Sequence, residues 1–172
     1  MDNNARQSRT VRRRLLLAVL LLPLVGCGRS EPPRKEPVAA AVRQWFKTAR
    51  VGDQGRFCAW TFMAYDVPTR LWKRIGASFD APGPPVAPPP LEVERNCRGE
   101  YSFTTFFDRP VQRATRVVGV RRIRIGSPVQ DAGGITNTAT AVAIVRDKTG
   151  RHHWPMHLVQ YRGRWRVLLH YD

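Results

Sequence analysis

Apolar residues recur at helical spacing in the first half of the chain and at strand spacing in the second, which predicts an α+β fold with its helices first. From Val38 to Ala49 they fall on the stripe of an amphipathic helix, and Gly52 is a stop signal after it. Asp53 predicts the N-cap of a short second helix, and Pro68 lies in the first turn of a third. The apolar residues of these two helices are Phe57, Cys58, Trp60, Leu71, Trp72 and Ile75.

Six prolines between residues 82 and 90 predict a loop without regular structure. The rest of the chain is strand-like over residues 111–125, 135–145, 151–161 and 164–171. A two-residue turn at Arg162-Gly163 joins the last two strands and places Tyr161 opposite Arg164. A turn over residues 147–150 joins the strand at 135–145 to the strand at 151–161. Both turns place the apolar side chains of the three strands on the same face of the sheet. We therefore predict an antiparallel sheet in this register.

The predicted register separates the side chains of these strands onto two faces. One face carries three alanines opposite large apolar residues, in the set Ala139, Ala141, Ala143, Trp154, Met156, Leu158, Trp165, Val167, Leu169 and Tyr171. The small residues leave room for a docked helix or a pocket, whose candidate lining is Trp45, Tyr65, Trp154, Met156 and Trp165. The other face is a candidate partner or homodimer surface and carries Thr140, Val142, Ile144, His157 and His170.

The first 27 residues predict export from the cytoplasm. Three arginines at positions 12–14 precede an apolar run over residues 15–25, which Pro23 interrupts. A membrane-spanning helix needs about 20 residues, so this run is too short for a permanent span. The arginines fit either a twin-arginine signal or an ordinary Sec signal.

The end of this segment, Leu24-Val25-Gly26-Cys27, resembles the lipobox of bacterial lipoproteins. In that family the cysteine thiol receives a diacylglyceryl group and a peptidase cleaves just before it. The resemblance implies a signal peptide over residues 1–26 and a lipidated Cys27 at the start of a flexible, proline-rich tether that ends at residue 37. A domain over residues 38–172 would then sit at the extracytoplasmic face of the cell membrane. The alternative for Cys27 is a buried or disulfide-bonded cysteine.

The net charge of +16 on 172 residues would by itself favour nucleic acid or an anionic surface as partner. Only four of the 29 basic residues are lysine, an arginine skew that is typical of GC-rich genomes. Loss of residues 1–26 would leave 24 basic and 12 acidic residues, or +12. Since an exported protein does not ordinarily meet nucleic acid, we predict no nucleic-acid partner. Anionic lipid, an acidic wall polymer or an envelope protein is expected instead.

Five arginines within 12 residues are the candidate contacts to such a surface: Arg113, Arg116, Arg121, Arg122 and Arg124. A solvated strand face is the alternative. Arg121 and Arg122 are adjacent and would point to opposite faces of a regular strand, so they require a bulge or an exposed edge. Three more cations, Arg43, Lys47 and Arg50, fall off the apolar stripe of the first helix.

Cys58 and Cys97 form an even pair in an oxidising compartment, which predicts a disulfide. The chain has no Cys-x-x-Cys spacing, so a metal site or a reactive thiol at these positions has little support. The bridge would enclose the proline-rich loop and limit its freedom.

The order of these elements resembles the nuclear transport factor 2-like (cystatin-like) α+β cone. The resemblance rests on an amphipathic helix, two shorter helices and long antiparallel strands that end in Gly163-Arg164-Trp165-Arg166-Val167. It is strongest to exported actinobacterial lipoproteins with this domain, in which a helix-borne cysteine pairs with one upstream of the strands. The resemblance implies a curved sheet around the first helix with a conical cavity. Some relatives are isomerases or dehydratases with Asp, His or Tyr in the cone, and others bind ligands or partners.

Candidate chemistry is sparse in this sequence, and we predict no cofactor and no metal. His153 and His157 lie about 13 Å apart on a strand, too far for one ion, and solvated histidines are the simpler interpretation of these and of His152. The possible acid–base groups in a cone are Tyr65, Asp66, Tyr101 and Asp108. Asp66 is more simply a helix cap and Asp108 a turn residue.

Two functions follow from these observations. The first is a membrane-anchored envelope lipoprotein whose non-enzymatic cone domain binds a ligand or partner. The second is a small cone enzyme, an isomerase, dehydratase or hydrolase that acts on an apolar molecule. Ionisable side chains inside an apolar cavity would favour the enzyme, and a cavity filled by Trp154, Met156 and Trp165 would favour the binding protein.

Overall fold

The computed structural model describes residues 34–75, 83–103, 115–130 and 133–169. Several predictions therefore lie outside the described residues. They concern the signal segment and Cys27, the tether as far as residue 33, Asp108, Arg113, His170, Tyr171 and the side chain of Tyr101. The described part belongs to one compact unit that begins at Pro33.

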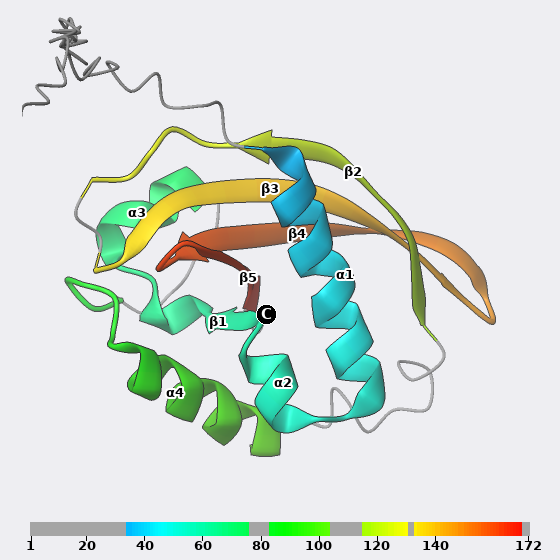
Figure 1. Ribbon diagram of the computed structural model, residues 1–172, viewed down its shortest axis with the longest axis horizontal. Helices are drawn as coiled ribbons and strands as arrows, with labels where there is room; N and C mark the ends of the chain where they lie inside the picture. The colour runs from blue at the N-terminus through cyan, green and yellow to red at the C-terminus, as the bar shows by residue number, and fades with distance from the viewer. Residues whose placement is uncertain (1–33, 76–82, 104–114, 131–132, 170–172) are drawn as a thin grey trace, which may run out of the picture. The chain divides into compact units, whose positions relative to one another are not determined.

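The fold is α+β, with a few helices and a five-stranded open sheet (Figure 1). The helices are α1 (Lys35–Val51), α2 (Gln54–Cys58), α3 (Thr69–Ile75) and α4 (Pro90–Phe103), with a 3₁₀ turn η1 (Ala64–Asp66). The strands are β1 (Thr61–Met63), β2 (Arg116–Ile125), β3 (Ile135–Asp147), β4 (Gly150–Tyr161) and β5 (Arg164–Leu169).

The sheet has the strand order β1-β5-β4-β3-β2 and is mixed. Strands β2 to β5 pair antiparallel, as predicted, whereas β1 pairs parallel to β5. The expectation of a purely antiparallel sheet is therefore wrong. Strand β1 has only three residues, all buried, so it lacks the alternation by which a strand is identified in a sequence.

Helix α1 begins at Lys35, three residues before the predicted domain boundary. Pro37 is accommodated because the N–H groups of a first helical turn have no partner inside the helix. Gly52 ends the helix as predicted, with a φ of +73° and its N–H directed to the carbonyls of Thr48 and Ala49. Asp53 caps α2, because its Oδ1 accepts a hydrogen bond of 3.0 Å from the N–H of Arg56.

The register of β3, β4 and β5 confirms the prediction. Tyr161 lies opposite Arg164, and the two residues between them both have positive φ, at +48° for Arg162 and +78° for Gly163. This is the conformation that a two-residue hairpin turn requires. The three alanines lie opposite the large side chains, in the pairs Ala139–Leu158, Ala141–Met156 and Ala143–Trp154.

Cys58 on α2 and Cys97 on α4 form the predicted disulfide. Helix α4, which positions Cys97 against α2 and β1, was not predicted. Its amphipathic pattern is weak, because only Val93 and Cys97 are buried among its described side chains. Each of these two residues is the one buried position of its helical turn. Pro90 is the first residue of α4, where proline is favoured.

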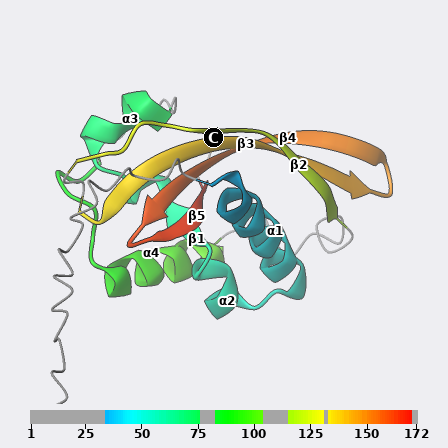
Figure 2. The same cartoon turned by 45° about the horizontal axis from the view of Figure 1, so that its top comes forward.

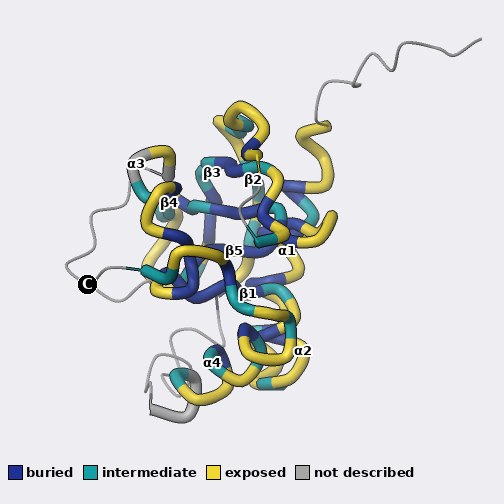
Figure 3. Tube along the Cα trace, turned by 90° about the vertical axis from the view of Figure 1, so that its left-hand side faces the viewer, coloured by how far each residue is buried: buried dark blue, intermediate teal, exposed yellow. Residues whose placement is uncertain are grey.

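The sheet arches over α1, which packs against its concave face (Figure 2). Buried positions follow the central strands, while α2 and α4 carry exposed, intermediate and buried positions along their length (Figure 3). A second apolar cluster lies on the opposite face, around the end of the sheet near α3. It includes Phe62, Val67, Leu71, Ile135, Val159, Tyr161 and Leu168.

Candidate functional site

Apolar side chains fill the concave face of the sheet, where a cone would hold its ligand. Trp45 of α1 lies 5.3 Å from Phe57 and Phe46 lies 5.5 Å from Trp154, measured between ring centroids. The Trp45 Nε1–H donates to Thr61 Oγ1, whose hydroxyl donates to the Phe57 carbonyl. The alanine row is thus occupied by a docked helix.

Four of the five predicted pocket residues are brought together in this core. Trp45, Met156 and Trp165 are buried and Trp154 is half-buried, all within the cluster beneath α1. Tyr65 is 39% exposed and lies outside that cluster. Among the described residues, the ionisable side chains that are buried are Asp66, Tyr161 and Arg166, and none of them belongs to the concave cluster.

The outer face of β2, β3 and β4 carries the first candidate binding surface. Val142 and Ile144 are half-buried there, opposite Pro155 and His153 of β4. Two adjoining hollows of about 280 and 190 Å³ share Arg124 and Thr140 on this face. The charged or titratable residues among the described lining are Arg74, Arg122, Arg124 and His157, and this described lining includes no carboxylate. We call this surface the outer hollow.

Strand β2 contains the bulge that the two adjacent arginines required, and it also forms an edge of the sheet. The register shifts between Arg121 and Arg124, and Arg122 between them has a φ of +53°. Arg121 pairs with Val142 and Arg124 with Thr140, so both belong to the outer face. A bulged, cationic edge also resists pairing with a strand of another chain.

Arg116, at the start of the same strand, lines a different surface. A groove of about 300 Å³ runs between α1 and β2, and its cations are Arg43, Lys47, Arg50 and Arg116. Phe46, Thr115 and Val117 complete the lining, and none of the described residues that line the groove carries a carboxylate. We call it the basic groove. The four described arginines of the predicted anionic contact are therefore divided between two surfaces.

The α1 cations of the basic groove were noted in the sequence only as residues off the apolar stripe. Their spacing of four and three residues puts Arg43, Lys47 and Arg50 on one side of the helix, and this signal could have marked them as a group. Arg74 has no comparable signal, because it reaches Arg124 only through the packing of α3 near β3.

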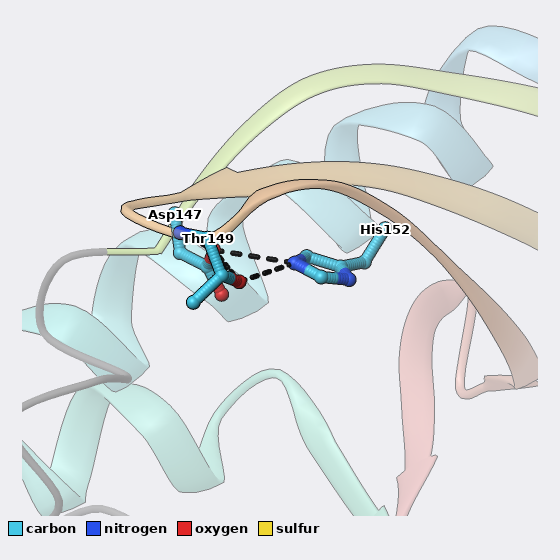
Figure 4. A network of polar contacts seen from close by, with 3 residues as sticks. All are labelled: Asp147, Thr149 and His152. Atoms are coloured by element: carbon cyan, nitrogen blue, oxygen red, sulfur yellow. Dashed lines mark hydrogen bonds and ion pairs between the residues drawn. The ribbon is translucent and has the colours of Figure 1, made fainter.

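The histidines do not form a metal centre in the described part of the chain, where no group of three or more His, Cys, Asp or Glu side chains converges. Asp147 Oδ1 instead accepts hydrogen bonds from the Thr149 N–H and hydroxyl and lies 3.2 Å from His152 Nε2 (Figure 4). The bonds from Thr149 lower the pKa of Asp147 to about 2. This network closes the β3–β4 turn.

Asp66 is a buried carboxylate that sequence reasoning interpreted as a helix cap. That interpretation is wrong, because its Oδ1 accepts a 2.7 Å hydrogen bond from the Asn96 side chain of α4. Its Oδ2 is buried with no hydrogen-bond partner among the described residues. Burial, opposed by the Asn96 bond and reinforced by Glu92, raises the pKa of Asp66 to about 6.

Asp66→Asn is expected to raise the free energy of unfolding by about 2 kcal/mol at pH 8 and to leave it nearly unchanged at pH 4. The full shift corresponds to at most about 3 kcal/mol, which partial solvent screening reduces. Because the folded-state pKa is raised, the ionisation penalty is absent below about pH 4 and fully present above pH 6. Urea unfolding between pH 4 and 8 measures the difference. Parallel profiles of variant and wild type would contradict this account.

Arg166 is a second buried charge, on the outer face of β5 next to Val159. Its guanidinium lies 5.3 Å from the centre of the Tyr161 ring, while Nε and Nη1 have no hydrogen-bond partner among the described residues. Burial lowers the pKa of Arg166, and the ring face partly compensates for the lost hydration.

Comparison with known proteins identifies no relative: no protein-family model, no curated protein and no solved structure matches this chain. Within the described ranges, none of the helices has the length and apolarity that a membrane crossing demands.

Proposed function

We propose that this chain is an exported lipoprotein, anchored to the cell membrane through diacylglyceryl-Cys27, whose α+β domain binds an acidic partner protein through the outer hollow. The domain would be a nuclear transport factor 2-like cone in which the first helix occupies the concave face. The arched sheet over α1 and the cysteine pair between α2 and α4 support this assignment. The lipobox-like sequence before Cys27 supports the anchor.

The outer hollow is the observation that carries the binding function. It combines half-buried Val142 with a rim of arginines, and half-buried Ile144 lies two residues further along the same face of β3. Helix α3 reaches one end of this surface through Arg74. Such a surface suits a partner that buries the apolar strip and presents carboxylates to Arg121, Arg122 and Arg124. A second copy of the chain would bring the same cations face to face, and like charges would oppose that dimer.

The concave face supports binding rather than catalysis. General acid–base work requires an ionisable group in a dry pocket. The buried polar side chains described next to α1 are threonines, namely Thr48, Thr61 and Thr115, and the first two hydrogen-bond to backbone carbonyls. The enzyme alternative therefore gains no support from the described residues of this face.

A photo-crosslinking residue at Val142 in cells is expected to capture an acidic partner protein. The same residue at Val51, which is 68% exposed at the end of α1, is the matched control and should capture it at least about tenfold less. Arg121→Glu combined with Arg124→Glu should abolish the Val142 crosslink. A crosslinked species of twice the chain mass would identify a homodimer instead, and equal crosslinking at both positions would contradict the proposal.

The same cells test the anchor independently. Fatty-acid label should appear on the wild-type chain and be lost from Cys27→Ala, while the outer-hollow variants retain it. Label that persists in Cys27→Ala would contradict lipidation at this residue without affecting the crosslinking result.

A further inference from the structure

The basic groove is left unused by the proposed partner surface. Its four cations come from two elements, three from α1 and Arg116 from β2. Among the described residues, the acidic contact of these cations is the ion pair of Arg43 with Glu36. It is 2.9 Å long and solvent-exposed at both side chains, so it contributes little. The groove therefore holds a concentrated positive charge next to an apolar floor formed by Phe46 and Val117.

Helix stability does not account for this arrangement. A cation in the last turn, such as Arg50, is favoured by the helix dipole. That effect does not extend to Arg43, two turns earlier, or to Arg116 on a strand. Cations three and four residues apart on one side of a helix repel one another, so an anion in the groove would relieve a cost that the free protein carries.

We propose that the basic groove binds the phosphate of an anionic lipid headgroup in the membrane that carries the protein's anchor. The cations surround the phosphate, and the Phe46 and Val117 side chains contact the glycerol and the first acyl carbons. Guanidinium groups suit this role because they bind phosphate oxygens in a two-pronged geometry.

The length of the tether allows this contact. Lys35, where α1 begins, is eight positions after Cys27, and an extended chain over eight positions spans less than about 30 Å. Arg43 to Arg50 lie roughly 12–22 Å further along the helix axis. The anchor thus keeps the groove within reach of the bilayer surface at a high effective concentration. The closeness of the groove to the bilayer rests on the proposed lipidation of Cys27, whereas the positive charge of the groove does not.

Acylation of Lys47 tests the proposal on the full lipidated chain. Vesicles of phosphatidylcholine are compared with vesicles that contain 30% phosphatidylglycerol, and mass mapping gives the acylation rates of Lys47 and Lys35. Since each cation near an anionic surface contributes about fivefold to binding, Lys47 should react at least about fivefold more slowly on the anionic vesicles. Lys35 lies closer to the anchor, so protection of Lys35 equal to that of Lys47 would indicate mere proximity and overturn the proposal.

Two double variants distinguish binding in the groove from a nonspecific attraction of the positively charged domain to the anionic membrane. Arg50→Glu combined with Arg116→Glu should remove the protection of Lys47. Arg121→Glu combined with Arg124→Glu makes the same charge change on the outer face and should retain it. Loss of protection in both double variants would overturn the groove as the site.

A soluble probe distinguishes a lipid from free phosphate. Glycerol phosphate, added to the phosphatidylcholine vesicles at the same phosphate concentration, should leave Lys47 reactive. Protection equal to that by phosphatidylglycerol would assign the groove to free phosphoesters and overturn the lipid assignment. Failure of the anchor would be seen separately, as release of the chain from the phosphatidylcholine vesicles.

Discussion

Replacing Cys58 and Cys97 together by alanine is expected to lower the free energy of unfolding by about 4 kcal/mol, the chain-entropy value for a closed loop of this length. The bridge joins residues 39 positions apart and encloses α3 together with the proline-rich segment. Without it, the unfolded chain regains the freedom of that loop. Both cysteines are buried, so their alanine replacements also lose contacts with the core.

Urea unfolding of the oxidised wild type and the double variant measures this difference. Wild type unfolded in the presence of a reductant also lacks the crosslink, so its stability should fall close to that of the double variant. It should stay slightly higher, because reduced wild type keeps the buried cysteine side chains. A loss below about 1 kcal/mol would show that the denatured chain remains compact without the bridge, which would contradict the entropic account.

The cysteine pair illustrates what a sequence can and cannot predict here. The pairing was predicted from the even number of cysteines and from an expected oxidising compartment, without knowledge of where the two cysteines lie in the fold. The helix that carries Cys97 gave no such signal, because Val93 and Cys97 are its only buried positions among the described side chains. Helix α4 forms where its environment, α2 and β1, supplies the packing.

The sheet register was predictable because two short turns constrain it. Arg162-Gly163 and the turn at residues 147–150 each fix one pair of strands, and a slip by one residue would move every side chain to the other face. Strand β1 had no such constraint. It is three residues long, and its parallel pairing with β5 joins segments about a hundred residues apart.

The charged residues of the candidate surfaces could be identified from the sequence, but the surface on which each one lies could not. The five arginines of residues 113–124 formed one group in the sequence, yet the bulge around Arg122 keeps Arg121 and Arg124 on one face. Arg116 instead lines the groove together with the α1 cations. Bulges and the docking of helices depend on tertiary packing, and a strand's alternation alone does not contain that information.

Trp45→Ala is expected to lower the free energy of unfolding by about 3–5 kcal/mol, the range for a large aromatic side chain removed from a core. Trp45 is 3% exposed, packs edge-on against Phe46 and tilts against Phe57. The alanines opposite α1 have no side-chain length with which to fill the space, so the site cannot collapse around the deletion.

Trp45→Phe separates packing from hydrogen bonding. It keeps an aromatic ring but removes the Nε1–H that donates to Thr61, and should cost about 1–2 kcal/mol. Val51→Ala on the exposed end of the same helix is the matched control and should change stability by less than about 0.5 kcal/mol. Thermal and urea unfolding measure all three variants. If Trp45→Ala cost no more than Val51→Ala, the concave face would have to be loosely packed, and a ligand-holding cone would replace the filled core as the description of this fold.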